Sequence, residues 1–371
     1  MLNKNKNKNK NKNKNKNKKV SVVGVVGVPA CYGGFESLVQ NLIDYKSDNI
    51  DYHVFCSSGS YDIKIKTYKK AELTYIPLKA NGGSSIIYDI TCLLISLFKR
   101  PDTVLILGVS GCVFLPIFKF FSRSNIITNI DGLEWRRGKW GAGVRAFLKF
   151  SEKLAVKYSD VVISDNEAIS KYVYQEYGKQ SHVIAYGGDH ALQAIQVEDE
   201  CNGDYYFSVC RIEPENNIMM ILKAFCKTVA KIKIIGNWNA SAYGRDLKEK
   251  YGQYSNIELI DPVYNIDILF KLRSQCLGFI HGHSAGGTNP SLVEAMHFKK
   301  PIFAFDCDFN RFSTNNSAYY FNSDIELLSL ISEPYNEKTL AKYAECAEKM
   351  KEIAMTQYTW VEITRLYEEL Y

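Results

Sequence analysis

The stretch HGHSAGGTNPSLVEAM, residues 281–296, lies where an apolar run ends and a helical pattern begins. The preceding CLGFIHG (276–282) is typical of a buried strand, and Pro290 suits the first turn of a helix. Gly286 and Gly287 let the backbone between strand and helix approach a ligand closely. Because the first amides of a helix lack partners within it and carry the positive end of its dipole, we expect this loop to bind an anion.

Short apolar runs alternate with helical patterns on both sides of this stretch. The expected strands are 20–27, 52–58, 103–108, 125–131, 160–165 and 182–187, and then 205–210, 231–236, 257–261, 276–282 and 301–306. Helical patterns lie between most of them, as in the apolar spacing of Leu38, Val39, Leu42 and Ile43. This alternation predicts an α/β protein whose parallel sheets are covered on both faces.

A polar segment at 193–205 separates the two sets of strands and predicts two Rossmann-like domains. We expect an N-terminal domain over 20–188, a C-terminal domain over 189–345, and a C-terminal helix over 346–371 that braces the first domain. In such sheets ligands bind beyond the carboxyl ends of the strands, where the strand order reverses. The loops that follow strands are therefore the expected places for chemistry.

The net charge of +6 comes from residues 2–19, which contain nine lysines and no acidic residue. The rest of the chain has 37 basic and 40 acidic residues, so nothing in it is typical of a nucleic-acid-binding surface. The Asn/Lys repeat predicts a disordered tail over 1–19, either functionally silent or weakly tethered to anionic lipid. It lacks the apolar segment of a signal peptide.

The ten cysteines include no C-x-x-C pair, which is typical of reduced thiols in a cytoplasmic protein. No run of 18 uninterrupted apolar residues occurs, so we expect no membrane-spanning helix. Residues 112–124 instead put Phe114, Leu115, Phe118 and Phe121 on one helical face. That face either lies in a lipid interface or packs on the sheet.

The loop after the first expected strand contains Gly33 and Gly34 ahead of a helical pattern. Glycines at this point let the backbone approach an anion, although the G-x-G-x-x-G fingerprint is missing and a plain turn is the alternative. We assign this loop to an acceptor or a diphosphate. Its candidate residues are Gly33, Gly34, Phe35 and Glu36.

A second loop, NIDGLEWRRGKW (129–140), is more polar than a structural turn requires. Charged groups at a strand end indicate a polar ligand, and a solvated loop is the alternative. We take Asp131 as a catalytic candidate. The other candidates for binding an acceptor or a diphosphate are Glu134, Trp135, Arg137 and His283.

A third loop, CRIEPENN (210–217), places Arg211 after the first strand of the second set, where its guanidinium can hold a phosphate. A local ion pair with Glu213 or Glu215 is the alternative. Arg211 is the second catalytic candidate, and Glu294 is suited to accept two ribose hydroxyls, with a helix-capping role as its alternative. The donor-binding candidates are Glu215, Asn216, Gly286, Gly287, Thr288, Asn289, Ser291 and Glu294.

Two further patterns do not predict a metal site. The Asp306-Cys307-Asp308 triplet is a short match of a kind that is frequent by chance, and it lies outside the glycine-rich loop. His281 and His283 lack a third ligand at a suitable spacing.

Taken together, these features resemble the retaining GT-B glycosyltransferases of family 4. The stretches VPACYGGFE (28–36), NIDGLEWRRGKW, CRIEPENN, HGHSAGGTNPSLVEAM and FDCDFNR (305–311) are similar to the bacterial rhamnosyltransferases that build capsule or O-antigen units. The resemblance covers residues 20–371 and implies two Rossmann-like domains facing across a cleft. It also implies transfer of L-rhamnose from dTDP-rhamnose with retention, without metal or cofactor. The implied acceptor is a polyprenyl-diphosphate-linked saccharide, and the implied place is the cytoplasmic membrane surface, on its inner face.

Position by position, Glu294 matches the second glutamate of the family's E-x7-E motif, which holds the donor ribose, while the first falls at Gly286. Arg211 matches one of the two basic residues that grip the diphosphate, and Asn216 stands in place of the other. Asp131 stands where many members have a histidine that contacts the donor sugar. The alternatives are another nucleotide sugar, a nucleotide-sugar epimerase of the same fold, or a binding protein with an inactive site.

Overall fold

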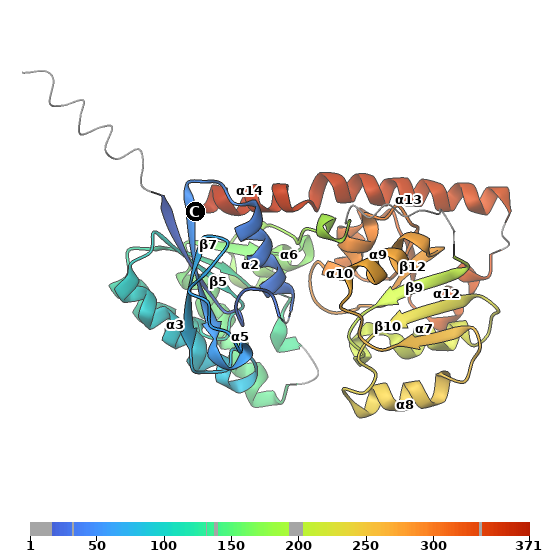
Figure 1. Ribbon diagram of the computed structural model, residues 1–371, viewed down its shortest axis with the longest axis horizontal. Helices are drawn as coiled ribbons and strands as arrows, with labels where there is room; N and C mark the ends of the chain where they lie inside the picture. Colours follow the sequence, from blue (N-terminus) through green and yellow to red (C-terminus); the bar gives the residue numbers. More distant parts are fainter. Residues whose placement is uncertain (1–16, 32, 131, 137–139, 193–202, 334–335) are drawn as a thin grey trace, which may run out of the picture. The chain divides into compact units, whose positions relative to one another are not determined.

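The computed structural model describes residues 17–31, 33–130, 132–136, 140–192, 203–333 and 336–371. These residues form two compact units (Figure 1). Unit 1 comprises the described residues up to Asp165, together with Ile169–Ile184 and Ile363–Tyr371, and unit 2 comprises Asn166–Ala168 and the described part of Ala185–Glu362. The division between the units therefore lies close to the boundary expected at 188. In addition, Asn166–Ala168 belong to unit 2 and Ile363–Tyr371 belong to unit 1.

Unit 1 is built on a sheet with the strand order β3-β4-β2-β1-β5-β6-β7-β8. All neighbours are parallel except β3 and β4. Its strands are β1 (Lys18–Val23), β2 (Ile50–Ser57), β3 (Thr67–Tyr68), β4 (Ala71–Ile76), β5 (Thr103–Leu107), β6 (Asn125–Asn129), β7 (Val161–Ser164) and β8 (His182–Val183). Its helices are α2 (Gly34–Tyr45), α3 (Ser85–Lys99), α4 (Leu115–Phe121), α5 (Ala142–Tyr158) and α6 (Glu167–Tyr177), with short 3-10 turns at Ser58–Ser60, Gly82–Ser84, Cys112–Phe114 and Glu134–Arg136.

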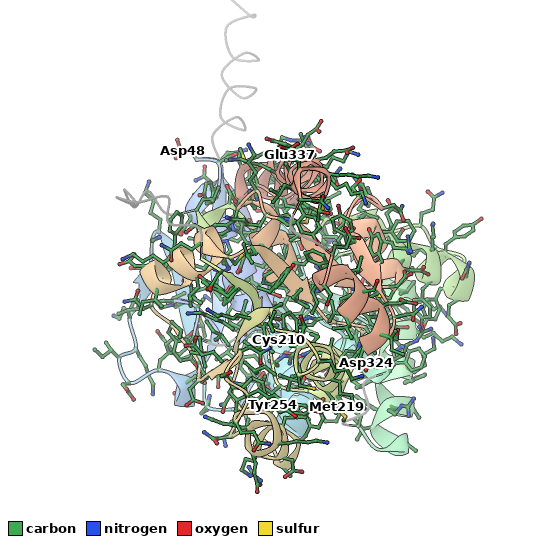
Figure 2. The ribbon with its side chains drawn as sticks, turned by 90° about the vertical axis from the view of Figure 1, so that its right-hand side faces the viewer. Asp48, Cys210, Met219, Tyr254, Asp324 and Glu337 are labelled. Carbon is green, nitrogen blue, oxygen red and sulfur yellow. The ribbon has the colours of Figure 1, made fainter. Side chains whose placement is uncertain are left out.

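Unit 2 has a wholly parallel sheet with the strand order β11-β10-β9-β12-β13-β14. Its strands are β9 (Tyr205–Val209), β10 (Lys231–Ile235), β11 (Ile257–Ile260), β12 (Gly278–His281), β13 (Ile302–Phe305) and β14 (Tyr319–Phe321). Its helices are α7 (Ile218–Phe225), α8 (Ala242–Tyr251), α9 (Ile266–Gln275), α10 (Pro290–Met296), α11 (Asp308–Ser313), α12 (Asp324–Ile331) and α13 (Glu337–Gln357), with 3-10 turns at Asp189–Ala191 and Pro214–Asn216. Figure 2 draws the side chains of both units and labels Cys210, which follows β9, and Met219 on α7.

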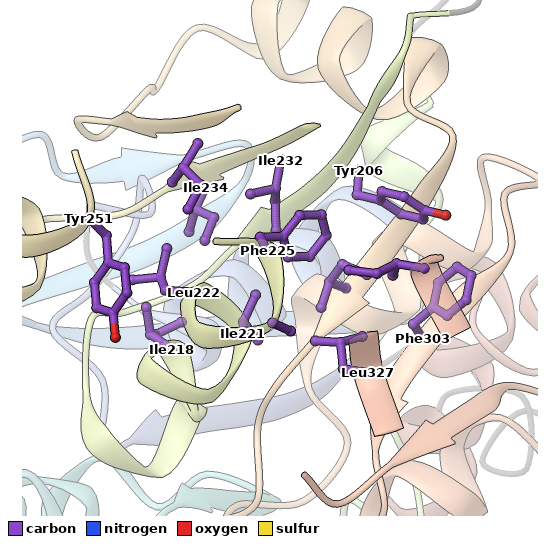
Figure 3. Packing of buried hydrophobic residues seen from close by; sticks show 14 of the residues in the cluster. Tyr206, Ile218, Ile221, Leu222, Phe225, Ile232, Ile234, Tyr251, Phe303 and Leu327 are labelled. Carbon is purple, nitrogen blue, oxygen red and sulfur yellow. The ribbon is translucent and has the colours of Figure 1, made fainter. Parts of the chain in front are cut away.

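The core of unit 2 shows why its apolar runs fold as they do. Figure 3 shows Ile221, Leu222 and Phe225 of α7 packed with Ile232 of β10 and Tyr206 of β9. The apolar spacing of α7 puts one helical face on the sheet, while the strands are apolar on both faces because helices cover both. Burial on this scale stabilises the fold by roughly 25 cal/mol per Å² of apolar surface.

Several boundaries differ from the sequence prediction. Strand β1 begins at Lys18, so two lysines expected in the tail pair with the sheet, and the amide of Lys18 donates to the carbonyl of Asn49 at 2.8 Å. The strand expected over 182–187 is limited to β8. Strands β3, β4 and β14 were not predicted, because the first and last are very short and β4 includes polar residues that blur its apolar pattern.

The helix expected over 346–371 is two helices, the long α13 and then α14 (Trp360–Leu370). The last residues of the chain lie in unit 1. There the hydroxyl of Tyr367 accepts from Asn129 Nδ2 at 2.9 Å, and the hydroxyls of Tyr371 and Tyr52 are 2.8 Å apart.

The exposed apolar side chains of residues 112–124 also differ from the set that the sequence predicted. Leu115 and Phe118 are fully buried, so this part of α4 packs inside unit 1, which is the alternative that the sequence left open. Phe121 is exposed, as are Ile117 and Phe120, which the predicted face did not include. The exposed apolar side of α4 is therefore rotated away from the predicted one.

The strand order reverses at one point in each sheet. In unit 1 the reversal lies between β1 and β5, and in unit 2 it lies between β9 and β12. At such a point the loops leaving the two neighbouring strands diverge and leave room for a ligand at the carboxyl edge. The glycine-rich stretch 281–296 and the loop 210–217 both leave the reversal point of unit 2.

Candidate functional site

The two loops at the reversal point of unit 2 are joined by hydrogen bonds. The carbonyl of Glu215 accepts from the amide of Ser284 at 2.9 Å and from its hydroxyl at 2.8 Å. Asn217 Nδ2 donates to the carbonyl of Gly282 at 2.8 Å. A Cβ at Gly282 would lie 2.2 Å from the carbonyl oxygen of Asn216, so only glycine allows this approach. The loops after β9 and β12 thus form one surface.

The loop after β9 holds Arg211 and Asn216 in different ways. The Asn216 amide is buried and donates to the carbonyl of Arg211 at 2.7 Å, so it supports the loop instead of facing a ligand. The side chain of Arg211 is 61% exposed, and its Nε lies 3.8 Å from Glu213 Oε2. This is the local ion pair that the sequence left open as an alternative. Because an exposed pair is weak, an anionic ligand can compete with Glu213 for the guanidinium.

The start of α10 is capped by Asn289. Its Oδ1 accepts from the amide of Ser291 at 3.1 Å and from the hydroxyl of Ser291 at 2.8 Å. Both polar groups of Ser291 are therefore held by the cap, which differs from the expectation that Ser291 presents its amide to an anion. Capping by a side-chain oxygen satisfies one of the otherwise unpaired amides at the start of a helix.

The glycine-rich loop ahead of this cap has an open side and a buried side. Gly286 has a φ of +116°, a conformation that favours glycine, and a Cβ there would meet no atom within 4 Å. Gly287 is half-buried. Thr288 is buried, and its hydroxyl accepts from Asn166 Nδ2 at 3.3 Å. Gly286 therefore offers backbone beside open space, while Thr288 faces the interior of unit 2.

Glu294 lies on α10, one turn beyond the cap, with most of its side chain buried. Its Oε2 forms an ion pair with the guanidinium of Arg273 on α9, and its Oε1 lies 3.4 Å from His190 Nε2. Burial raises the pKa of this carboxyl, but the charge of Arg273 and the hydrogen bond with His190 outweigh burial, so the pKa is lowered. Glu294 is therefore ionised and held from two sides.

The imidazole of His190 is itself oriented by Trp360. The indole Nε1 of Trp360 donates to His190 Nδ1 at 2.9 Å, and the Trp360 amide donates to Asp189 Oδ1 at 2.9 Å. Because Nδ1 accepts this bond, the proton of the neutral ring lies on Nε2, the nitrogen that faces Glu294. Sequence reasoning missed Arg273, His190 and Trp360, since all three are distant from Glu294 in the chain and no local motif marks them.

The two histidines of the opening stretch stack on each other. The ring centroids of His281 and His283 are 4.4 Å apart with an interplanar angle of 13°. Burial, together with the neighbouring His283, lowers the pKa of His281 well below its usual value. The carbonyl of His283 accepts from Asn310 Nδ2 at 2.9 Å, which ties this loop to α11.

The Asp306-Cys307-Asp308 triplet has a structural partner. Arg311 binds Asp306 with two hydrogen bonds, Nε to Oδ1 at 2.5 Å and an Nη to Oδ2 at 2.7 Å. This bidentate pair lowers the pKa of Asp306. Among the residues that the structure describes, no group of three or more His, Cys, Asp or Glu side chains is arranged to hold a metal ion.

In unit 1, the loop after β1 is held by Glu36. This buried carboxylate accepts from the amide of Val26 at 2.7 Å and from that of Gly33 at 2.8 Å. Burial raises the pKa of Glu36, although the bonds from backbone amides lower it in part. Glu36 therefore shapes the loop, whereas the sequence assigned it to ligand binding. Gly33 precedes α2, and Gly34 is its first residue.

Phe35, the next residue of α2, lies beside the neighbouring loop. Its Cε2 would be 3.8 Å from a Cβ at Gly108, the residue after β5. A Cβ at Gly24, after β1, would lie 2.1 Å from the carbonyl oxygen of Leu107 at the end of β5. The loops that leave the reversal point of unit 1 are therefore in contact, as they are in unit 2.

Two tryptophans in the described part of the polar loop over 129–140 donate hydrogen bonds to glutamates. Trp135 Nε1 donates to Glu152 Oε2 at 3.1 Å, and Trp140 Nε1 donates to Glu134 Oε1 at 3.0 Å. Glu152 is buried on α5 and also accepts from the hydroxyl of Tyr172 at 2.5 Å. Trp135 and Glu134 thus have partners within unit 1. The candidates Asp131 and Arg137 lie outside the described residues.

Two parallel-sheet units of this kind, each with its loops joined at a reversal point, define a two-domain α/β architecture in which ligands bind at the carboxyl edges of the sheets. Comparison with known proteins makes this more specific. Residues 17–189 match the family model described as "Domain of unknown function (DUF1972)". No curated protein matches the sequence.

Several solved structures share the fold at low sequence identity. Sucrose-phosphate synthase (tll1590) from Thermosynechococcus elongatus has a TM-score of 0.76 and 12% identity, covering 95% of this chain and 98% of that chain. Anabaena Alr3699/HepE in complex with UDP-glucose has a TM-score of 0.71 and 15% identity, with the same coverage. A glycosyltransferase from Rickettsia africae has a TM-score of 0.71 and 12% identity, covering 96% of this chain and 98% of that chain. The predicted GT-B fold is confirmed.

Proposed function

We propose that the protein is a glycosyltransferase that moves a sugar from a nucleotide sugar to a saccharide acceptor. The observation that carries the proposal is Glu294, an ionised carboxylate held by Arg273 and His190 beside the loops at the reversal point of unit 2. A fixed carboxylate with two oxygens suits a pair of ribose hydroxyls. A protein of the same fold, Anabaena Alr3699/HepE, binds UDP-glucose, which agrees with a nucleotide-sugar donor.

The donor in this proposal is dTDP-rhamnose, and the new bond forms with retention. Both statements rest on the resemblance of the loop sequences to bacterial rhamnosyltransferases. In the reaction the bond between the anomeric carbon and the diphosphate oxygen breaks, and an acceptor hydroxyl attacks the same face. Its proton passes to the leaving oxygen, so no separate nucleophile is required.

The charge that develops on the leaving diphosphate needs a positive partner. Arg211 is exposed just after β9 and forms a weak pair with Glu213, so its guanidinium is available for this role. The backbone at Gly286 lies beside open space, where close contact with the diphosphate is sterically allowed. The proposed reaction uses no metal or cofactor.

The acceptor in this proposal is a saccharide linked to polyprenyl diphosphate, and the product belongs to a capsule or O-antigen. Such an acceptor stays in a membrane, so we place the protein at the inner, cytoplasmic face of the cell membrane without a spanning segment. The alternative within the same class is a different nucleotide sugar, since UDP is the nucleotide in the structures of two proteins of the same fold.

The deciding experiment incubates the purified protein with dTDP-rhamnose, dTDP-glucose, UDP-glucose and UDP-N-acetylglucosamine, each with and without a bacterial lipid extract. Transfer of labelled sugar into the lipid fraction only when extract is present supports the proposal. Conversion of a free nucleotide sugar without extract identifies an epimerase instead. Nucleotide binding by calorimetry without turnover of any donor identifies a binding protein, and loss of transfer in Glu294→Gln links the activity to the site.

A further inference from the structure

Helix α3 lies on the outside of unit 1 (Figure 1). It carries a stripe of exposed apolar side chains. Its outward residues Ile87, Leu94 and Phe98 are spaced by seven and four positions, which puts them on one side of the helix. Phe98 is 85% exposed, whereas Tyr88 and Leu93 on the inner side are fully buried. The segment Gly82–Lys99 is also long and apolar enough to cross a membrane by length and composition. Because its inner side packs on unit 1, it is a surface helix whose outer side is apolar.

Helix α4, which packs against α3, carries a second group of exposed apolar side chains. α4 contacts both α3 and α5. Its residues Ile117, Phe120 and Phe121 follow the spacing of one helical face, and the two phenylalanines are 81% and 68% exposed. Their rings meet edge to face, with centroids 4.9 Å apart. Two neighbouring helices therefore present large apolar side chains to solvent, more than scattered surface residues would provide.

The charges on α3, α4 and α5 have one sign at the surface. The acidic residues of these helices are Asp89 and Glu152, and both are buried. The exposed charged residues on these helices are Lys99, Lys119, Arg145, Lys153 and Lys157. In the segments that follow the helices, Arg100 and Arg123 are exposed, and so are the acidic residues Asp102 and Asp160. Lys99 pairs with Glu72 and Lys119 pairs with Asp160. The net charge of this surface is therefore basic, although these two lysines are neutralised by their partners.

We propose that the apolar face of α3 and α4, defined by Ile87, Leu94, Phe98, Ile117, Phe120 and Phe121, docks on an anionic lipid bilayer. Apolar side chains flanked by lysine and arginine are the composition that binds the boundary between lipid headgroups and acyl chains. A symmetric dimer through the same face would bring basic surfaces together, which disfavours a second copy as the partner. The inference rests on the proposed function, because docking there brings the protein to a lipid-linked acceptor.

The test is flotation of the full-length protein with vesicles of phosphatidylcholine alone and of phosphatidylcholine mixed with phosphatidylglycerol. The Asn/Lys tail also carries charge, so every variant is made both in the natural sequence and with the lysines at positions 4, 6, 8, 10, 12, 14 and 16 changed to glutamine. The test variant is Phe98→Gln/Phe120→Gln/Phe121→Gln. The matched control is Val229→Gln/Tyr264→Gln/Ile325→Gln, three comparably exposed apolar residues of unit 2.

We expect the test variant to lower partitioning onto the mixed vesicles by at least about tenfold in both backgrounds, while the control floats like the natural protein. Equal flotation of the test variant and the control overturns the proposal. So does a concentration-dependent dimer, measured by light scattering, that the test variant abolishes. Calorimetry with dTDP and UDP on the same samples separates the two proposals. Vesicle binding without nucleotide binding overturns the proposed function alone, and nucleotide binding without vesicle binding overturns the docking face alone.

Discussion

Trp360 donates its indole N–H to His190 Nδ1 at 2.9 Å, and this bond determines which ring nitrogen faces Glu294. The two residues are 170 positions apart in the chain, so no local pattern links them. If Glu294 holds the donor ribose, Trp360 is a positioning residue that acts through His190.

The first prediction concerns this relationship. Trp360→Phe should weaken dTDP or UDP binding severalfold, because the imidazole loses its fixed orientation and Glu294 loses one of its two supports. Isothermal titration calorimetry measures the effect. The control is Trp238→Phe, which removes a comparable bond from the indole to the carbonyl of Ile260 elsewhere in unit 2. If both variants bind nucleotide equally well, Trp360 has no role in positioning Glu294.

The second prediction concerns the pair formed by Glu294 and Arg273. Glu294→Gln should weaken nucleotide binding by roughly 1–3 kcal/mol if its oxygens hold buried hydroxyls. Arg273→Ala should instead lower the free energy of unfolding by about 3 kcal/mol, since it leaves a largely buried carboxylate without its counter-charge. Urea denaturation and calorimetry on both variants separate the two effects. Glu352→Gln, an exposed acid on α13, is the control, and unchanged nucleotide affinity in Glu294→Gln would refute the ribose role.

The third prediction concerns Arg211. Its replacement by alanine should lower kcat more than it weakens donor binding, if the guanidinium stabilises charge that develops only as the diphosphate leaves. Arg245→Ala, another exposed arginine of unit 2 whose Nη1 donates to the carbonyl of Asn239, should change neither quantity. An equal loss of kcat and of donor affinity would show that Arg211 binds the donor equally well in the ground state and in the transition state.

The fourth prediction concerns the pH dependence of stability at Asp89. This carboxyl is buried under the loop after β5, where it accepts from the hydroxyl of Ser110, and burial raises its pKa to about 7 despite that bond. Its folded-state pKa lies above the unfolded value, so folding favours the protonated form. Its contribution to stability is complete below about pH 4 and is lost as the pH rises to 7.

Asp89→Asn cannot ionise and should escape this loss. Compared with the natural protein, its free energy of unfolding should be similar at pH 4.5 and higher by about 1–3 kcal/mol at pH 8. Denaturation at both pH values measures the difference. A gap that is equal at the two pH values would show that Asp89 does not titrate in this range.

The fifth prediction concerns donor choice by the loop over 129–140. We expect a preference for dTDP-rhamnose over dTDP-glucose on the order of a hundredfold in kcat/KM, because a pocket shaped for a methyl group rejects an added hydroxyl only moderately. Asp131→Ala should be nearly inactive while it still binds dTDP. Transfer of rhamnose by this variant at the natural rate would show that Asp131 has no role at the sugar.

The sequence by itself determined the architecture of this protein. The alternation of apolar runs with helical patterns predicted two parallel-sheet units. Three of the four loops singled out by their composition leave the reversal points of strand order, whereas the loop over 129–140 follows β6. These features can be read from short stretches of sequence. A strand is predicted from its own apolar residues, and a close approach of two backbone segments is predicted from the glycine that allows it, as at Gly282.

Only the tertiary structure decided what individual side chains do. Asn289 takes both polar groups of Ser291, Glu36 binds the backbone of its own loop, and the exposed face of α4 is rotated from the predicted one. The supports of Glu294 come from positions 190 and 273. The physical reason is the same in each case. The partner of a buried polar group, and the side of a helix that is buried, depend on which distant segments pack against it, and periodicity along the chain does not contain that information.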